Sequence, residues 1–156
     1  MAAVVDSVEV SRRPEEVFAY LDDLSRHGEW QENVSSIEVD GGRSTEVGSR
    51  ATETRRLGGF EHRVTYEITE RTPPSGFAFQ GVGGLVRPFG RRTIEPLEGG
   101  SRSRITLELD FCGYGVGKLL VPFVRHWARK HAPVNNRRLR DRLESGAAIG
   151  GFHQKA

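Results

Sequence analysis

The sequence predicts an α+β domain in which a curved antiparallel sheet of seven strands wraps around one long C-terminal helix. Three observations carry this prediction. Between residues 35 and 111, apolar and polar residues alternate with period two in successive short segments, as in half-buried strands. From Val116 to Glu144, apolar residues recur at helical spacing instead. After residue 32 no helical pattern separates the strands, so the alternation that a parallel βαβ sheet requires is missing.

The N-terminal segment predicts one strand and two short helices. Residues 3–10 alternate apolar and polar. A helix is predicted from Pro14 to about Asp23, because proline suits the first helical position and two glutamates follow it where the helix dipole favours acidic side chains. A second helical segment is predicted from Leu24 to about Glu32.

Six strands are predicted next, separated by turns rich in glycine or proline. The clearest lies at 60–68, where strict alternation places one histidine and one tyrosine on its apolar face. The strand at 85–97 contains Pro88 and Pro96, which favour an edge position, a bulge or a frayed end. The expected strands are around 35–39, 47–57, 60–68, 77–79, 85–97 and 105–111.

The last predicted element is a helix of about 30 residues from Val116 to Glu144. Pro133 lies inside it, lacks a backbone donor and disfavours helical geometry at Ala132. We therefore expect either a kink between His131 and Pro133 or two helices in tandem.

Length and composition indicate a single domain at 1–146 followed by a flexible tail at 147–156. A chain of 156 residues can bury a full core without a disulfide or a metal. The single cysteine excludes an intramolecular disulfide and argues against a cysteine zinc site, so we expect no metal and no cofactor. No signal peptide and no apolar run long enough to span a membrane are present, which predicts a cytoplasmic protein, either monomeric or dimeric.

Charge is distributed unevenly along the chain. Between residues 113 and 146 there are eight basic and two acidic residues, a net charge of +6, whereas the whole chain carries +2. This helix could bind an acidic protein, an anionic membrane surface or nucleic acid. The simpler interpretation is the solvated face of an amphipathic helix, and nucleic-acid binding is not expected.

The sequence resembles the helix-grip superfamily, the START-related and SRPBCC proteins that include polyketide cyclase/dehydrase-like and lipid-transfer domains. The resemblance extends from Val4 to Glu144. It is carried by the segment from Ser11 to Phe18, by Trp30, by the run from Ile94 to Leu107 with its Gly99-Gly100 turn, and by Leu139, Leu143 and Glu144. It implies a seven-strand sheet that grips the C-terminal helix, with a ligand cavity between them, and it supports fold better than activity.

If that cavity exists, the alternation along each strand selects its lining. Mostly apolar walls with a few polar groups are typical of a site for a flat or hydrophobic ligand. The same alternation would fit a filled core. The expected ligand-binding residues are Trp30, Ala51, Glu53, Arg55, Phe60, His62, Val64, Tyr66, Phe77, Phe79, Ile94, Leu107, Leu109, Leu120, Phe123, Val124 and Trp127, with Ile37, Val39, Ile105, Phe111 and His131 on the same faces.

The polar candidates within this set are Glu53, Arg55, His62 and Tyr66. His62 and Tyr66 share a strand face but lie about 13 Å apart, so they cannot touch. As catalytic candidates, the histidine could act as a general base and the tyrosine as an acid. Alternatively, both are half-buried residues with polar tips at the cavity mouth, which is the more economical interpretation. Glu53 and Arg55 form either an inward ion pair or an exposed strand end.

Three functions remain open on the sequence. The first is binding, transport or sequestration of a hydrophobic small molecule such as a lipid, a polyketide or an aromatic metabolite. The second is a polyketide aromatase/cyclase-dehydratase that uses His62 or Tyr66. The third is a docking module that acts through the basic C-terminal helix, and this leaves peripheral membrane contact open.

Overall fold

The computed structural model describes residues 2–40, 45–57 and 59–146. The tail expected at 147–156 lies outside these residues. The elements are β1 (Val4–Val10), α1 (Pro14–Asp22), the 3₁₀ helix η1 (Leu24–Glu29), β2 (Val34–Asp40), β3 (Arg50–Leu57), β4 (Phe60–Thr72), β5 (Gly76–Gly81), β6 (Val86–Leu97), the 3₁₀ turn η2 (Glu98–Gly100), β7 (Arg102–Gly113), the 3₁₀ helix η3 (Gly115–Leu119) and α2 (Val121–Glu144).

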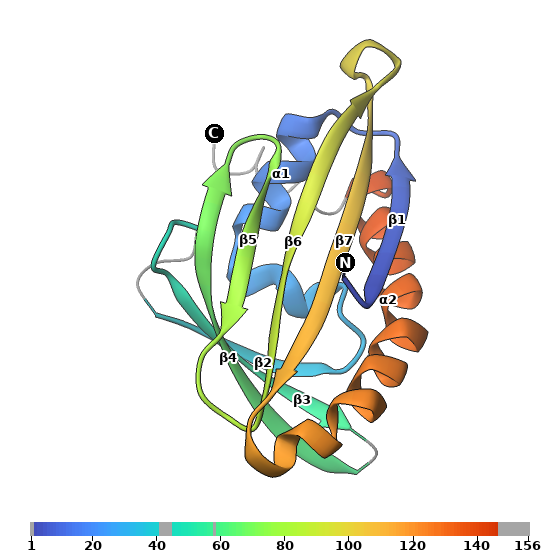
Figure 1. The fold of residues 1–156 in the computed structure, drawn as a ribbon. Helices are drawn as coiled ribbons and strands as arrows, with labels where there is room; N and C mark the ends of the chain where they lie inside the picture. Colours follow the sequence, from blue (N-terminus) through green and yellow to red (C-terminus); the bar gives the residue numbers. More distant parts are fainter. Residues whose placement is uncertain (1, 41–44, 58, 147–156) are drawn as a thin grey trace.

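The seven strands form one antiparallel sheet in the order β1-β7-β6-β5-β4-β3-β2, with α2 running beside β1 (Figure 1). Every pair except β1 with β7 joins strands that are consecutive in the chain, so the sheet is a meander closed by the N-terminal strand. The architecture confirms the predicted α+β fold. The second helical segment is shorter than expected, because η1 ends at Glu29.

β6 is an interior strand of the sheet, but β5 pairs with only its middle part. Its pairing with β5 runs only from Phe89 to Thr93, whereas its pairing with β7 runs from Val86 to Leu97. Pro88 and Pro96 therefore lie where β6 has a neighbour on one side only. At both positions β6 is locally an edge strand, as the first of the expected alternatives has it, although the strand as a whole is interior.

The long helix differs from expectation in two ways. It begins at Val121 rather than Val116, because residues 115–119 form η3. It also continues through Pro133 to Glu144 as one α-helix, so the prediction of two tandem helices is wrong. The proline removes one internal hydrogen bond, but Ala132 before it and Asn136 after it are buried against the sheet, and this packing holds both sides of the proline in one helix.

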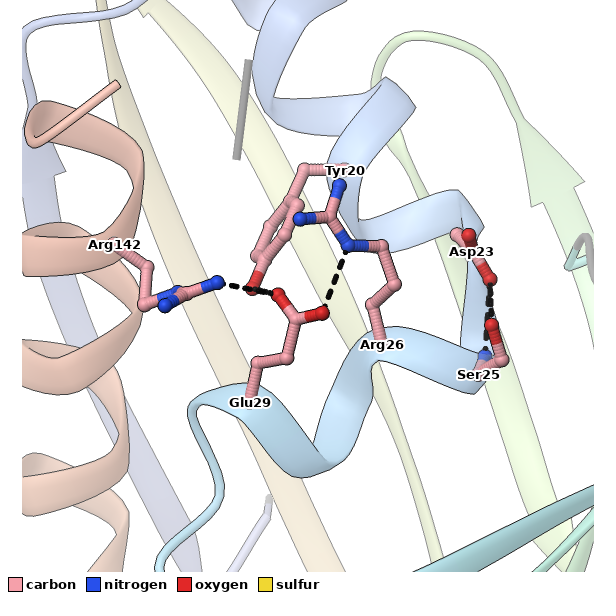
Figure 2. Close-up of polar contacts among 6 residues, drawn as sticks. All are labelled: Tyr20, Asp23, Ser25, Arg26, Glu29 and Arg142. Atoms are coloured by element: carbon pink, nitrogen blue, oxygen red, sulfur yellow. Dashed lines mark hydrogen bonds and ion pairs between the residues drawn. The ribbon is translucent and has the colours of Figure 1, made fainter. Parts of the chain in front are cut away.

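One end of the concave face is filled by a core that joins α1, η1, the end of α2 and the sheet. Its fully buried members include Tyr20, Leu24, Trp30, Leu139 and Leu143. A polar cluster at the same end ties the helices together, with Glu29 at its centre (Figure 2). The Glu29 carboxylate accepts hydrogen bonds from the Tyr20 hydroxyl (2.9 Å), Arg26 Nε (3.0 Å) and Arg142 Nη2 (2.8 Å).

Burial, strengthened by the neighbouring Glu29, raises the pKa of Tyr20 to about 12, so its hydroxyl remains a donor at neutral pH. Figure 2 also shows Asp23 accepting from the backbone N–H of Ser25, which caps η1 (3.1 Å). The helical layer is thereby fixed at the filled end, and the opposite end is left for a cavity.

Candidate functional site

A cavity of about 680 Å³ lies between the sheet and α2. β3 to β7 contribute to its wall, and so do Leu120 and residues of α2 as far as Asn135. Leu85, His27 and Gln31 complete it. Its walls are mainly aliphatic and aromatic side chains. Its volume falls within the range of small-molecule pockets.

The cavity is open at one end and closed at the other. Along β4, Phe60 is 78% exposed and Tyr66 is 7% exposed, and both line the cavity. β6 shows the same gradient, from the half-buried Val86 to Arg92, which is buried. The mouth therefore lies where β3 turns into β4, beside the start of α2, and the closed end lies against the core around Trp30.

The structure brings most of the expected lining residues together. Thirteen of the seventeen line the cavity, and so do Phe111 and His131 from the wider set. Those thirteen are Glu53, Arg55, Phe60, His62, Val64, Tyr66, Phe77, Phe79, Leu107, Leu109, Leu120, Val124 and Trp127.

Four of the expected residues lie elsewhere. Trp30, Ala51 and Ile94 are buried in the core beyond the closed end. Phe123 is 74% exposed, because the face of α2 that packs on the sheet runs through Val121 and Ala128 instead. Ile37, Val39 and Ile105 also pack in or against the core rather than in the cavity wall.

Glu53 and Arg55 form the inward ion pair that was one of the two expected alternatives. Arg55 donates to Glu53 Oε2 from Nη2 at 2.6 Å and from Nε at 3.0 Å, and it also donates to the amide oxygen of Gln31. The Tyr66 hydroxyl donates to Glu53 Oε1 at 3.2 Å. Glu53 is buried, which makes this a desolvated carboxylate held by three donated hydrogen bonds.

Arg92 is a second buried cation in the cavity wall. Its Nη1 donates to Asn136 Oδ1 (3.1 Å), and Asn136 in turn donates to Asp6 Oδ2 (2.7 Å). Its guanidinium lies 4.6 Å from the centre of the Trp30 ring. Burial lowers the pKa of Arg92 to about 10, with Glu53 acting in the opposite direction, so the side chain stays charged at neutral pH.

Sequence reasoning missed Arg92, although the signal was present. Arg92 lies two residues before Ile94 and therefore on the same face of β6. Only the apolar member of the pair was selected. His27 and Gln31 carried no comparable signal, because they lie in and just after η1 rather than in a strand.

The two catalytic candidates occupy different environments. His62 is exposed at the mouth, opposite Arg55 on the neighbouring strand. Tyr66 lies deep, and burial, reinforced by the charge of Glu53, raises the pKa of Tyr66 well above its ordinary value. The tyrosine can therefore donate a hydrogen bond or a proton at neutral pH, but it cannot serve as a base.

Two more histidines line the cavity. His27 is buried and donates from Nε2 to the carbonyl oxygen of Leu21 (2.9 Å), and burial lowers its pKa. His131 stacks on Trp127 with ring centres 4.4 Å apart. Within the described part of the chain, no three His, Cys, Asp or Glu side chains are grouped so as to hold a metal ion.

Several cations of the basic C-terminal helix already have partners within the fold. Arg125 pairs with Asp110 at 2.8 Å, and Arg142 pairs with Glu29 at 2.8 Å. Arg129 donates to the carbonyl oxygen of Ala3 (3.0 Å). These contacts attach the helix to its own domain. Among the described helices, none is long and apolar enough to cross a membrane.

Comparison with known proteins agrees with the resemblance. The family model described as polyketide cyclase/dehydrase and lipid transport matches residues 1–144. The uncharacterized protein MT1597 of Mycobacterium tuberculosis is 29% identical over 116 residues, which cover 70% of this chain and 77% of that protein.

Solved structures share the architecture at low sequence identity. The Zhui aromatase/cyclase from a Streptomyces species superposes with a TM-score of 0.76 at 14% identity, covering 92% of this chain and 94% of that one. A START superfamily protein from Mycobacterium smegmatis gives 0.72 at 16% identity, with coverage of 91% and 97%. Such identities show a common START-like fold.

Proposed function

Because the chain belongs to the polyketide cyclase/dehydrase and lipid transport family, we propose that it binds a hydrophobic small molecule, such as a lipid, a polyketide or another aromatic metabolite, between the sheet and α2. The observation that carries this proposal is the cavity itself, which is large, lined mainly by apolar side chains and open at one end. Burial of apolar ligand surface would supply most of the binding free energy.

The polar groups deep in the cavity would orient the ligand. Glu53, Tyr66 and Arg92 are buried toward the inner end of the cavity, and Arg55 pairs with Glu53 from a position nearer the mouth. Phe60, Leu85 and Leu120 are exposed around the mouth. A ligand with one polar end would place that end against these side chains and its apolar body beneath Trp127. Bound in this way, it would leave fewer buried polar groups without a partner than it would in the reverse orientation.

Native mass spectrometry of protein purified from its own host tests this directly, because a tightly held molecule appears as added mass. A fluorescence titration with Nile red gives a second measurement. Val124→Trp adds bulk to the cavity wall and is expected to weaken probe binding at least tenfold. Val47→Trp, at an exposed site outside the cavity, is the matched control and should bind as wild type. Absence of co-purified ligand together with equal probe binding by both variants would refute the proposal.

A second candidate function, polyketide cyclisation and dehydration, is favoured by one specific observation. The Tyr66 hydroxyl lies in the cavity wall, donates to Glu53 and has its pKa raised, so it is protonated at neutral pH and would be available to a bound carbonyl once it turned from Glu53. Tyr66→Phe removes that donor and its hydrogen bond to Glu53 but keeps the aromatic ring. Turnover of a poly-β-ketone substrate that is unchanged in both Tyr66→Phe and His62→Ala would exclude these residues as catalysts.

A further inference from the structure

Exposed hydrophobic side chains are concentrated at the cavity mouth. Of the ten large hydrophobic residues that are exposed in the described part of the chain, seven lie in three segments, the start of β4, the β5–β6 loop and the stretch from Tyr114 into α2. We call them the mouth rim. They are Phe60, Leu85, Tyr114, Val116, Leu119, Leu120 and Phe123, and Leu119 and Phe123 are each 74% exposed.

Two segments of the mouth rim are held together by a backbone hydrogen bond and by close packing. The backbone N–H of Tyr114 donates to the carbonyl oxygen of Leu85 (2.8 Å), which joins η3 to the β5–β6 loop. Gly117 packs so closely on this loop that a Cβ there would lie 2.1 Å from the same carbonyl oxygen. Phe60, Leu85 and Leu120 line the cavity while being exposed, so the rim surrounds the opening directly.

The charge around the rim is positive. The segments 59–63, 84–87 and 114–123 contain Arg63, which pairs with Glu38 at 3.4 Å, Arg87 and Lys118, and one acid, Glu61. The stretch 111–140, which carries the larger part of the rim, contains no acidic residue at all. A clustered apolar surface bordered by cations is the composition that an anionic lipid interface selects.

We propose that the mouth rim docks on an anionic lipid bilayer, with Leu119 and Phe123 inserting among the acyl chains and Lys118 contacting lipid phosphates. A second copy of the chain is a poorer occupant, because a two-fold contact through the same face would set one subunit's cations against the other's. The basic residues further along α2 are not part of this surface. Arg138 lies 20 residues beyond Lys118, or about 30 Å along a helical path.

The docking surface is inferred from exposed apolar side chains and from charge. Only the route by which a ligand would enter rests on the proposed function. With the rim on a bilayer, the cavity mouth would face the lipid. A hydrophobic molecule could then pass between bilayer and cavity without exposing its apolar surface to water.

Vesicle co-sedimentation tests this proposal with phosphatidylcholine alone and with phosphatidylcholine containing phosphatidylglycerol. Wild-type protein should sediment with the anionic vesicles, and less so at high salt. Leu119→Ser and Phe123→Ser should each weaken partitioning about tenfold. Phe89→Ser, at an exposed phenylalanine outside the rim, is the matched control and should partition as wild type. Lys118→Glu should weaken binding to anionic vesicles about fivefold or more, whereas Arg138→Glu should weaken it less.

Nile red titration without vesicles separates failure of this proposal from failure of the proposed function. Leu119 and Phe123 do not line the cavity, so their variants should retain probe binding. A wild-type protein that binds the probe but no anionic vesicle overturns the docking surface and leaves cavity binding intact. Equal losses in Phe89→Ser and Phe123→Ser also overturn it, as does self-association that Leu119→Ser abolishes in a protein that ignores vesicles.

Discussion

Glu53→Gln tests how far the buried charge of Glu53 stabilises the folded protein. The substitution keeps the shape of the side chain and one acceptor oxygen but removes the negative charge that Arg55 contacts through two hydrogen bonds. Glu53 is 3% exposed, so little of the lost interaction is recovered by solvation of this side chain. Arg55 is 21% exposed and can relax partly toward the cavity. We therefore expect destabilisation without loss of the fold.

The magnitude follows from this burial. Breaking a buried ion pair by removing one partner costs roughly 3–5 kcal/mol, and a single hydrogen bond to a charged group contributes about 1.5–3 kcal/mol. The partial exposure of Arg55 and the remaining acceptor place the expected loss near 3 kcal/mol. In a chain of this size that lowers Tm by roughly 6–12 °C. Urea unfolding measured by circular dichroism gives the free energy of unfolding directly.

Glu67→Gln is the matched control. Glu67 on β4 pairs with Arg50 on β3 at 3.5 Å, but the two side chains are 36% and 50% exposed. Such a surface pair contributes about 0–1 kcal/mol. Equal stability of the two variants would refute the reasoning, and so would a Glu53→Gln protein more stable than wild type, because desolvation would then outweigh the pairing.

Three further substitutions test the framework around the site. Asp22→Asn should cost about 1–3 kcal/mol at neutral pH. Burial opposes ionisation of Asp22, but hydrogen bonds led by those from Arg71 outweigh it and lower the pKa of Asp22, so its contribution is full above pH of about 4 and is lost as pH falls through the lowered value. Thermal unfolding of both proteins from neutral to acidic pH should show the gap closing, and a constant gap would contradict this. Leu139→Ala should cost about 2–5 kcal/mol in urea unfolding, because the side chain is fully buried in the core, and a loss below about 1 kcal/mol would mean that the end of α2 is not packed as described. Gly117→Ala should destabilise by about 1–3 kcal/mol, because its Cβ would collide with the Leu85 carbonyl, and unchanged hydrogen exchange in η3 would contradict the close packing there.

The sequence was sufficient to predict the fold, because period-two alternation in each strand indicates which side chains face the helix. The alternation in residues 60–68 placed His62 and Tyr66 on the concave side, where both line the cavity. The period does not, however, predict whether a residue lines the cavity or lies in the core beyond its closed end. Trp30 and Ile94 were expected in the cavity wall and lie beyond it in the core, because the position at which helical packing fills the concave face is set by contacts between distant segments.

Helical spacing was less informative, because a large apolar side chain of α2 lies outside the face that packs on the sheet. Phe123 was selected for its side chain and points to solvent, whereas the buried positions include Ala128, Ala132 and Asn136. Small side chains allow the helix to approach the sheet closely. The asparagine is buried because it joins Arg92 to Asp6. Neither property registers as hydrophobic periodicity.

The two ends of the cavity have opposite chemistry, and this has a consequence for how a ligand would enter. The mouth is bordered by exposed Leu, Phe and Val side chains, whereas the inner wall carries Glu53, Tyr66 and Arg92. An amphipathic molecule in a bilayer presents its polar end to the surface. Under the two proposals above, it would leave the bilayer polar end first and meet the inner polar groups without turning round. Loss of the inner charge in Glu53→Gln should therefore slow transfer of an amphipathic ligand from vesicles more than it slows transfer of a purely apolar one of the same size. If transfer of both ligands is slowed equally, Glu53 does not orient the polar end of the ligand.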